Sequence, residues 1–341
     1  MSRSRFPVTI RDVAEQAGVS ISTVSRVLND KDDVASDTYE KVQSVIRELG
    51  YTSSLAARSM RSRRTNVIGL IVPDVEDSFT IQVMKGVNRE IMERDYDLLI
   101  YTSGSIKKQS AADRERHFVA LLNGSITDGI IMVTPAATSF STAAPVVAVD
   151  PNNQSPDCPA VIATNHTGVV TAMEYLIKLG HRRIGFIGGR PDLQCAQQRF
   201  EGYQDALARA GLPQDPDLIV VGDFTPETGH ECARQLLLLD ERPTGILAAN
   251  DQSAFGAMAA AREMGLRIPK DLSVVGFDNI PEAAHSDPPL TTIDQSVDKM
   301  GTVAVEMVID LIQGRPLDDF LYTMPTELVI RDSCRAVEAS A

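Results

Sequence analysis

Short apolar runs alternate with amphipathic segments over most of the chain from residue 66 onward. The runs with the length and composition of buried strands are residues 67–72, 97–101, 129–133, 146–149, 183–187, 218–221, 245–248 and 273–276. Helical spacing of apolar residues follows the first two runs, at 81–94 and around 108–122. This alternation predicts parallel, doubly wound sheets, whose ligands gather at the carboxyl ends of the strands. A stretch of about 275 residues favours two such lobes over one.

The first fifty residues have a different pattern, typical of short helices. Thr9 and Asp12 have the spacing of a capping box at a helix start, and Gly18 is placed to end that helix. Ser20 is placed to cap a second helix over residues 21–29, and an apolar stripe that ends at Gly50 indicates a third. Two short helices joined by a tight turn and followed by a third predict a helix-turn-helix domain.

The outer face of the second helix carries side chains suited to DNA. The positions opposite the buried stripe are Ile21, Ser22, Ser25 and Arg26. Arg26 can donate two hydrogen bonds to one guanine in the major groove, which is worth about 1–3 kcal/mol of discrimination. The residues suited to phosphate contacts that set register are Thr9, Ser25 and Asn29. The alternative is a solvated polar face on an ordinary three-helix packing unit.

Charge is divided unevenly along the chain. The formal net charge of −13 argues at first against a nucleic-acid partner. Residues 1–65, however, have a net charge of +3, and residues 66–341 have a net charge of −16. Four arginines, Arg58, Arg61, Arg63 and Arg64, cluster just before the first apolar run. The sequence therefore predicts a small basic head on a large acidic body.

Several function classes lack the motifs they need. No G-x-G-x-x-G, G-x-x-x-x-G-K-[ST] or G-x-S-x-G sequence is present, which argues against a dinucleotide-binding oxidoreductase, a phosphate-loop enzyme and a serine hydrolase. The four cysteines and five histidines have no metal-ligand spacing, so neither a metal nor a cofactor is expected. An apolar run of signal or membrane length is also absent, and we expect a cytoplasmic protein.

The head closely resembles the headpiece of the lactose-repressor (LacI/GalR) family of bacterial transcription regulators. The resemblance rests on the run from Thr9 to Asn29, on Leu49-Gly50-Tyr51 and on Ala56-Ala57-Arg58. It implies that Ile21, Ser22 and Arg26 read bases. It also implies that residues 54–61 form a hinge helix that enters the minor groove when two subunits meet on an operator, with Ala57, Arg58 and Met60 at the DNA.

The chain departs from the family pattern at the hinge. Tyr51-Thr52-Ser53-Ser54 replaces the usual Tyr-x-Pro-Asn, and Met60 replaces the leucine that is wedged between base pairs. Methionine is apolar and flexible enough to act as a wedge, so some kinking of the operator is expected. The alternative is that Met60 packs on the core.

The body resembles the effector-binding core of the same family, a two-lobed fold shared with periplasmic sugar-binding proteins. The matching segments are Ile71-Val72-Pro73-Asp74, residues 179–184, residues 199–202, residues 250–257, residues 274–278, residues 289–295 and residues 325–328. The resemblance thus extends from Thr9 to about Cys334. The fold class it implies is an all-α helix-turn-helix headpiece followed by an α/β core with two doubly wound parallel sheets.

Carried over position by position, the resemblance implies an effector pocket between the lobes. The pocket residues are Phe79, Asp150, Arg199, Phe224, Asn250, Asp278 and Gln295. Carboxylates, a guanidinium and aromatic rings together suit a mono- or oligosaccharide, although a nucleobase could use the same groups. Simpler alternatives are that Phe79 and Phe224 are plain core, that Asp150 or Asp278 caps a helix, and that Arg199 pairs with an internal carboxylate.

The resemblance also implies an organisation. We expect a headpiece at 1–53, a hinge helix and linker at 54–65, an N-terminal lobe at 66–162 with 292–325, and a C-terminal lobe at 163–291 with 326–341. Three crossings, near 162, 291 and 325, would join the lobes. The expected protein is a homodimeric regulator, most plausibly a repressor, on a pseudo-palindromic operator, and its effector could release DNA or promote binding. A transport receptor for sugars, the main rival, would have no use for the head.

Overall fold

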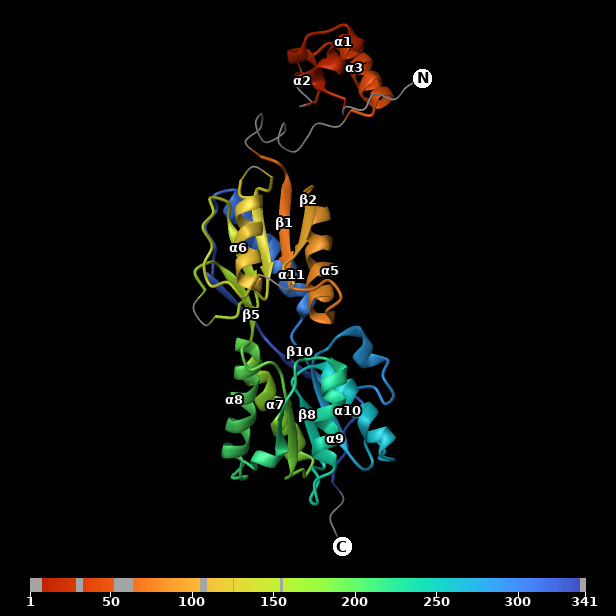
Figure 1. Ribbon diagram of the computed structural model, residues 1–341, viewed down its shortest axis with the longest axis vertical. Helices are drawn as coiled ribbons and strands as arrows, with labels where there is room; N and C mark the ends of the chain where they lie inside the picture. Colours follow the sequence, from red (N-terminus) through yellow and green to blue (C-terminus); the bar gives the residue numbers. More distant parts are fainter. Residues whose placement is uncertain are drawn as a thin grey trace. The chain divides into compact units, whose positions relative to one another are not determined.

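The computed structural model describes residues 8–28, 33–51, 64–104, 109–124, 126–153 and 156–337. The chain forms two compact units, residues 1–65 and residues 66–341 (Figure 1). Each unit has its own apolar core. Among the described residues, no helix combines the length and the apolar character needed to cross a membrane.

The first unit contains three helices. They are α1 (Ile10–Ala17), α2 (Ile21–Leu28) and α3 (Ser36–Leu49). Thr9 and Asp12 form the predicted capping box, in which Asp12 accepts a 2.7 Å hydrogen bond from the Thr9 backbone N–H. The glycines that end α1 and α3, Gly18 and Gly50, have left-handed φ values of 63° and 62°. The predicted helix-turn-helix arrangement is therefore confirmed, including the conformation of both glycine caps.

The second unit contains two six-stranded sheets, one in each of two lobes. The sheet of the N-lobe has the order β11-β5-β4-β3-β1-β2, and the sheet of the C-lobe has the order β12-β10-β9-β8-β6-β7. The N-lobe strands are β1 (Val67–Val72), β2 (Asp97–Thr102), β3 (Gly129–Val133), β4 (Val146–Val149), β5 (Ala160–Ala163) and β11 (Leu321–Met324). The C-lobe strands are β6 (Ile184–Gly188), β7 (Ile219–Val221), β8 (Gly245–Ala248), β9 (Ser273–Asp278), β10 (Thr291–Asp294) and β12 (Glu327–Val329).

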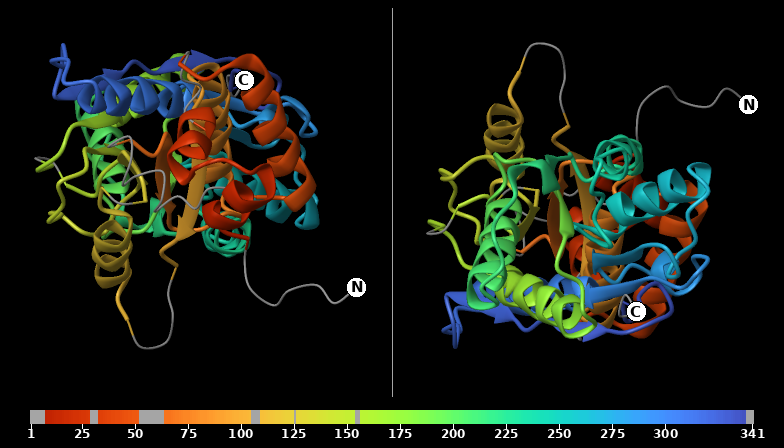
Figure 2. Two further views of the ribbon diagram at one scale, coloured as in Figure 1. Left: turned by 90° about the horizontal axis from the view of Figure 1, so that it is seen from above. Right: turned by 90° about the horizontal axis from the view of Figure 1, so that it is seen from below.

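Helices cover both faces of each sheet, as Figures 1 and 2 show. In the N-lobe, α5 (Ser78–Glu93) and α11 (Val297–Ile312) share one apolar cluster, and α6 (Ala111–Leu122) packs in another. In the C-lobe, α7 (Asn165–Lys178) pairs with α8 (Gln194–Arg209), and α9 (Pro226–Leu237) pairs with α10 (Asp251–Glu263). Two short 3₁₀ turns, η1 (Pro216–Leu218) and η2 (Pro281–Ala284), complete the C-lobe.

Both sheets are doubly wound, as the sequence predicts. The chain leaves β1 for β2 on one side and returns to β3 on the other, and β6, β7 and β8 repeat this order. Every strand pair is parallel except β10 with β12, which is antiparallel. The order reverses at β1/β3 and at β6/β8, and at such points the carboxyl ends of parallel strands leave a crevice for a ligand.

Three segments join the lobes, and one of them is displaced from its predicted place. The chain passes from β5 to α7, from β10 to α11 and from β11 to β12. The second crossing was expected near residue 291, but Thr291–Asp294 pairs in parallel with β9 and belongs to the C-lobe sheet. The crossing therefore follows Asp294, and the segment that returns to the N-lobe begins at about residue 295 rather than 292.

Two of the crossings are bonded to each other. The Thr164 backbone N–H donates to the Met324 carbonyl at 3.0 Å, and the Thr326 backbone N–H donates to the Thr164 hydroxyl at 3.0 Å. The two threonine hydroxyls also lie 2.8 Å apart. The segments that follow β5 and β11 are thus held side by side, and the segment that follows β10 begins after Asp294, which pairs with Glu327 beside them.

Candidate functional site

A cavity of about 330 Å³ lies where the carboxyl ends of both sheets meet. The residues that line it follow strands of both lobes or lie on α5, α6 and α8. They are Pro73, Asp74, Asp77, Phe79, Ala111, Glu115, Thr134, Ala136, Asp150, Asn152, Arg190, Asp192, Leu193, Cys195, Arg199, Asp223, Phe224, Asn250 and Asp278. Six of the seven predicted effector residues are among them. The volume is within the usual range of sites for small molecules.

Arg199 is the most firmly held side chain of the cavity. It is 4% exposed, and its guanidinium donates to the Asn165 side-chain oxygen at 2.9 Å and to the Ala249 carbonyl at 2.6 Å. The guanidinium carbon lies 3.8 Å from the centre of the Phe277 ring, and the nearest Asp278 oxygen is 3.5 Å from the guanidinium. These contacts fix the orientation of the guanidinium, and therefore the direction from which a ligand can accept its hydrogen bonds.

Asp278 ends β9 and faces Arg199 from the same lobe. Burial raises the pKa of this carboxyl from 3.8 to about 7, against the opposing effect of Arg199. Gln295, the seventh predicted effector residue, does not line the cavity: its amide donates to Asp278 at 2.6 Å from the crossing that follows β10. Gln295 therefore holds Asp278 in place from behind instead of forming the cavity wall.

The walls combine a carboxylate and two aromatic rings from different lobes. Asp150 follows β4, and burial raises its pKa while the Cys195 thiol donates to it. Phe79 lies in the first turn of α5, in the N-lobe. Phe224 follows β7 in the C-lobe, where its ring occupies the space that a side chain at Gly189 would need, with 2.0 Å between that Cβ position and the ring. Glycine at position 189 is thus required for this aromatic wall.

Two asparagines arrange the C-lobe helices at the cavity. Asn250 caps α10, because its side chain accepts a hydrogen bond from the Ser253 N–H and donates to the Phe224 carbonyl. Asn152 belongs to the N-lobe, yet its side chain accepts from the Gln194 N–H and donates to the Asp192 carbonyl, both at 2.7 Å. The first N–H of α8 is therefore capped from the other lobe.

Strained backbone marks the same cavity. Four lining residues without a glycine's freedom have positive φ: Thr134 (44°), Asp150 (50°), Phe224 (74°) and Asp278 (110°). Each lies at or just beyond the carboxyl end of a strand. Such conformations cost free energy and cluster at functional sites, so their position is independent support for a binding role.

Several lining residues were not singled out from the sequence. They are Asp77, Glu115, Asn152, Arg190, Asp192, Cys195 and Asp223. Most follow a strand or begin a helix, and the rule that ligands gather at the carboxyl ends of strands could have found Asn152, Arg190 and Asp223. Glu115 gives no such signal, because it lies in the middle of α6 and accepts from the Ala136 and Ala137 N–H groups.

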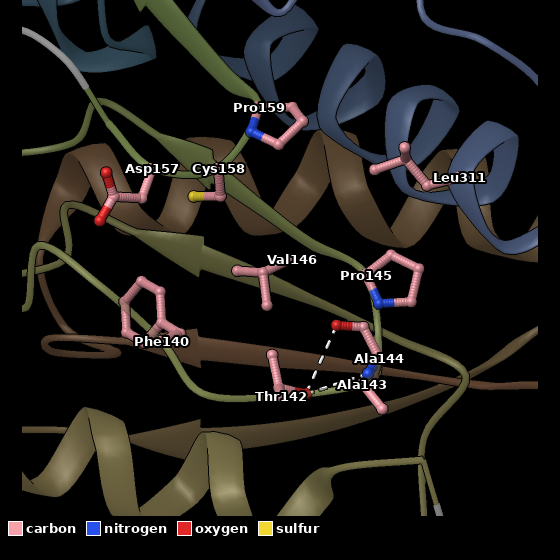
Figure 3. Close-up of a pocket in the computed structure, with 10 residues that line it drawn as sticks. All are labelled: Phe140, Thr142, Ala143, Ala144, Pro145, Val146, Asp157, Cys158, Pro159 and Leu311. Carbon is pink, nitrogen blue, oxygen red and sulfur yellow. Dashed lines mark hydrogen bonds between the residues drawn. The ribbon is translucent and has the colours of Figure 1, made fainter.

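A second cavity, of about 360 Å³, lies at the opposite edge of the N-lobe sheet, where β4 and β5 begin. Figure 3 shows Val146 and Pro159 at these strand starts, with Leu311 of α11 and Phe140 around them. Burial raises the pKa of Cys158 in this wall to about 11, so the thiol is un-ionised at neutral pH. Asp157 is the one carboxylate among the described residues of this cavity.

The predicted DNA-reading face is exposed in the first unit. Ile21 is 44% exposed, and Ser22 and Arg26 are also exposed on α2, while Ser25 is half-buried. The Arg26 guanidinium lies 3.6 Å from the Asp33 carboxylate, with both side chains open to solvent. The Thr9 hydroxyl donates to Asp12 within the capping box. The other predicted DNA contacts, Asn29, Ala57, Arg58 and Met60, lie outside the described residues.

The fold and the cavity together define a class: a helix-turn-helix unit followed by a two-lobed core like that of periplasmic binding proteins. Family models agree, matching residues 9–54 as "Bacterial regulatory proteins, lacI family" and residues 173–334 as a "Periplasmic binding protein-like domain". The chain belongs to the lacI family of bacterial regulatory proteins. It is a transcriptional regulator and not an enzyme, as the sequence predicts.

Individual relatives match almost the whole chain. The HTH-type transcriptional repressor PurR of Pasteurella multocida (strain Pm70) is 35% identical over 96% of this chain and 99% of its own length. The lac repressor dimer bound to operator and the anti-inducer ONPF has a TM-score of 0.86 at 29% identity, covering 97% of this chain and 100% of its own. The complex of the transcriptional regulator CelR with cellobiose has a TM-score of 0.71 at 29% identity, covering 96% and 99%.

Proposed function

We propose that this chain is a sequence-specific DNA-binding repressor whose operator affinity is set by a small polar effector, most simply a sugar. The observation that carries the proposal is the cavity lined by both lobes, which offers one ligand contacts on each of them. A ligand that touches both lobes favours one lobe arrangement over another, and the resulting population shift is bounded by its differential affinity.

The DNA contacts belong to the first unit. Ile21, Ser22 and Arg26 are proposed to meet base edges, and Thr9 and Ser25 to meet phosphates. Asn29, Ala57, Arg58 and Met60 are proposed to extend the contact through the linker. Two copies of the chain would place two heads on a pseudo-palindromic operator, in the cytoplasm where the chromosome lies. The similar lac repressor is bound to operator as a dimer, which supports this proposal.

A sugar suits the chemistry of the cavity. Asp150 and Asp278 offer carboxylate oxygens to hydroxyl groups, Arg199 offers a fixed guanidinium, and Phe79 and Phe224 offer ring faces for C–H groups. The structurally similar regulator CelR was solved with cellobiose, which also supports a carbohydrate.

A mobility-shift experiment tests the function. The purified chain should bind a DNA fragment from upstream of its own gene, selectively and with strong salt dependence, and a panel of mono- and disaccharides should change that affinity at least five-fold. Binding with no sequence preference would contradict the regulator assignment. Selective binding that no small molecule alters would contradict the effector role of the cavity.

A further inference from the structure

The effector cavity has a strong excess of negative charge. Seven carboxylates line it and only two guanidinium groups do, among the residues that the structure describes. The carboxylates are Asp74, Asp77, Glu115, Asp150, Asp192, Asp223 and Asp278, and the guanidinium groups belong to Arg190 and Arg199. A neutral effector would leave this excess in place, so the pairing of each group decides what charge the cavity can accept.

Part of the charge is already balanced within the wall. Arg190 contacts both carboxylate oxygens of Asp192, at 2.6 and 3.2 Å. Glu115 accepts two backbone N–H groups, and Asp223 accepts the N–H and hydroxyl of Thr225 as well as the Thr228 hydroxyl. These groups therefore have partners in the protein before any ligand arrives.

Three of the remaining carboxylates meet where the lobes meet. Asp77 and Asp150 belong to the N-lobe and Asp278 to the C-lobe, and the charges of the first two raise the pKa of the third. Arg199 is the cation that acts on both Asp150 and Asp278, and it also donates to neutral oxygens of the C-lobe. Asp150 and Asp278 thus share one guanidinium in a partly desolvated space, where like charges repel more strongly than in water, and Asp77 adds a third negative charge at the more exposed wall of the cavity.

The cavity walls also offer more free hydrogen-bond acceptors than free donors. The Asn152 amide donates to the Asp192 carbonyl, the Asn250 amide donates to the Phe224 carbonyl, and both arginines donate to protein oxygens. The asparagine donors are therefore occupied and Arg199 has two of its five N–H groups bonded to neutral protein oxygens, whereas Asp150 and Asp77 retain acceptor oxygens. An anionic ligand would find few donors beyond Arg199 and several like charges. A cation with several N–H donors would bond the free acceptor oxygens and also balance the negative charge.

We propose that the effector carries a protonated amine, held between Asp150 and Asp77 of the N-lobe and Asp278 of the C-lobe, as in an amino sugar. The inference rests on the proposed function, which makes this cavity the effector site. The aromatic walls and Arg199 would meet the ring and hydroxyl groups of the sugar. The amine would bridge carboxylates of both lobes and relieve their repulsion. Binding of the positive charge would therefore favour the arrangement in which the lobes are close together.

A matched set of sugars tests the charge. The full-length chain is titrated calorimetrically, near pH 6.5, with glucosamine, glucose, N-acetylglucosamine and glucose 6-phosphate, and with the chitosan disaccharide, cellobiose and diacetylchitobiose. We expect an amino member to bind at least ten-fold more tightly than its neutral and acetylated counterparts, and the phosphate ester not to bind. A neutral or anionic member that binds as tightly as the amino sugar, or a set in which no amino member binds, overturns the proposal.

Variants locate the amine. Asp150→Asn should reduce the ten-fold preference to less than three-fold, and Asp77→Asn, at an exposed position that keeps its helix-capping oxygen, should reduce it as well. Asp157→Asn removes an equal charge at the opposite edge of the N-lobe sheet (Figure 3) and should leave the preference unchanged. An amine preference that survives both Asp150→Asn and Asp77→Asn would exclude the proposed position.

Loss of the amine site and loss of the regulator function would give different results. A neutral sugar that binds as tightly as its amino counterpart and alters operator affinity would sustain the regulator function and overturn the amine. The absence of selective DNA binding would overturn the regulator function, whichever sugar binds.

Discussion

At the scale of single residues, the proposed DNA-reading surface depends on a competition for Arg26. In the free protein its guanidinium lies 3.6 Å from Asp33, and both groups are exposed, so the ion pair stabilises little and can be exchanged for a base. Asp33 therefore holds the Arg26 side chain on the exposed face of α2 by an ion pair weak enough to break when DNA binds.

Arg26→Ala should relax base preference at one position of each operator half-site, with a loss of about 1–3 kcal/mol on the preferred sequence. Binding measured on a set of operators with single base changes gives the result. Asp33→Asn is the matched control, and it should keep the base preference and bind all sequences somewhat more tightly. An equal loss for Arg26→Ala on every sequence would assign Arg26 to phosphate contact.

Asp278 should make the effector-free protein less stable as pH rises. Its pKa is about 7 in the folded chain and near 3.8 when unfolded, so the folded state binds more protons between these values. The free energy of unfolding contributed by this group therefore falls between about pH 4 and pH 7. The groups around it are Arg199, which opposes the rise in pKa, Asp77 and Asp150, which add to it, and the Gln295 amide. Burial and the charge of Asp278 also raise the pKa of Asp251.

Asp278→Asn removes that pH-dependent contribution together with the contact between this carboxyl and Arg199. The difference in melting temperature, variant minus wild type, should increase by a few degrees from pH 5 to pH 8. Thermal melts without sugar measure the difference. Parallel curves for the two proteins would show that the carboxylate is ionised throughout.

Residue-level prediction from the sequence succeeded where a residue type and a position coincide. Asp150, Arg199, Phe224 and Asp278 could be placed at the cavity through the family resemblance. Gln295 was predicted to line the cavity, but it lies behind Asp278. The sequence shows that a polar residue follows the strand, but it does not show that another side chain lies between that residue and the cavity. The positive φ of Asp150 and Asp278 was also beyond prediction, since the tertiary contacts impose it.

At the scale of elements, the inter-lobe cap on α8 links helix stability to lobe arrangement. Asn152→Ala would leave the Gln194 N–H and the Asp192 carbonyl without their 2.7 Å partners, at a cost of about 1 kcal/mol. The arrangement of the lobes in which Asn152 caps α8 should lose population, and the affinity for the effector should fall about five-fold. Calorimetric titration gives the affinity, and small-angle scattering should show a larger radius of gyration. Unchanged scattering together with unchanged affinity would contradict the cap as a closing contact.

The contact between α5 and α11 leaves no room for a side chain. A Cβ at Gly86 would lie 1.7 Å from the Asp298 backbone carbonyl oxygen, so one helix would have to move. Gly86→Ala should lower the free energy of unfolding by about 1–3 kcal/mol or more, despite the better helix propensity of alanine. Chemical denaturation measures the loss, and Lys85→Ala, at the exposed neighbouring position, serves as the near-neutral control. A neutral Gly86→Ala would show that the helices are separable.

Element prediction failed where buried strands are polar or edges are exposed, and it also missed β5, an apolar strand of only four residues inside the sheet. Four strands, β1, β3, β4 and β8, have their predicted bounds because every residue in them is buried and nearly all are apolar. β10 begins with two threonines, which are buried because Thr291 and Thr292 form hydrogen bonds with Arg331 and Asp251. β11 is largely exposed at the sheet edge, so an apolar-run criterion cannot find it.

At the scale of the whole molecule, the opposite charges of the two parts should confine DNA contact to the head. The +3 of residues 1–65 attracts phosphates, and the −16 of residues 66–341 is repelled by them. Operator affinity of the dimer should fall on the order of 10³-fold between 50 and 200 mM salt if about six phosphates are met. Filter-binding titrations at several salt concentrations measure the slope. A slope near zero would contradict the electrostatic role of the head.

The hydrogen bonds between Thr164 and Thr326 have a consequence for how the core moves. Three independent links would resist most relative motions of two bodies, whereas two links bonded together act as a single pivot. The third segment leaves β10 at Asp294, which pairs with Glu327 directly beside this pivot. Attachments gathered at one place restrain translation of the lobes more than rotation, so we expect an effector to change chiefly the angle between the lobes, and the relaxation after rapid mixing to follow one exponential.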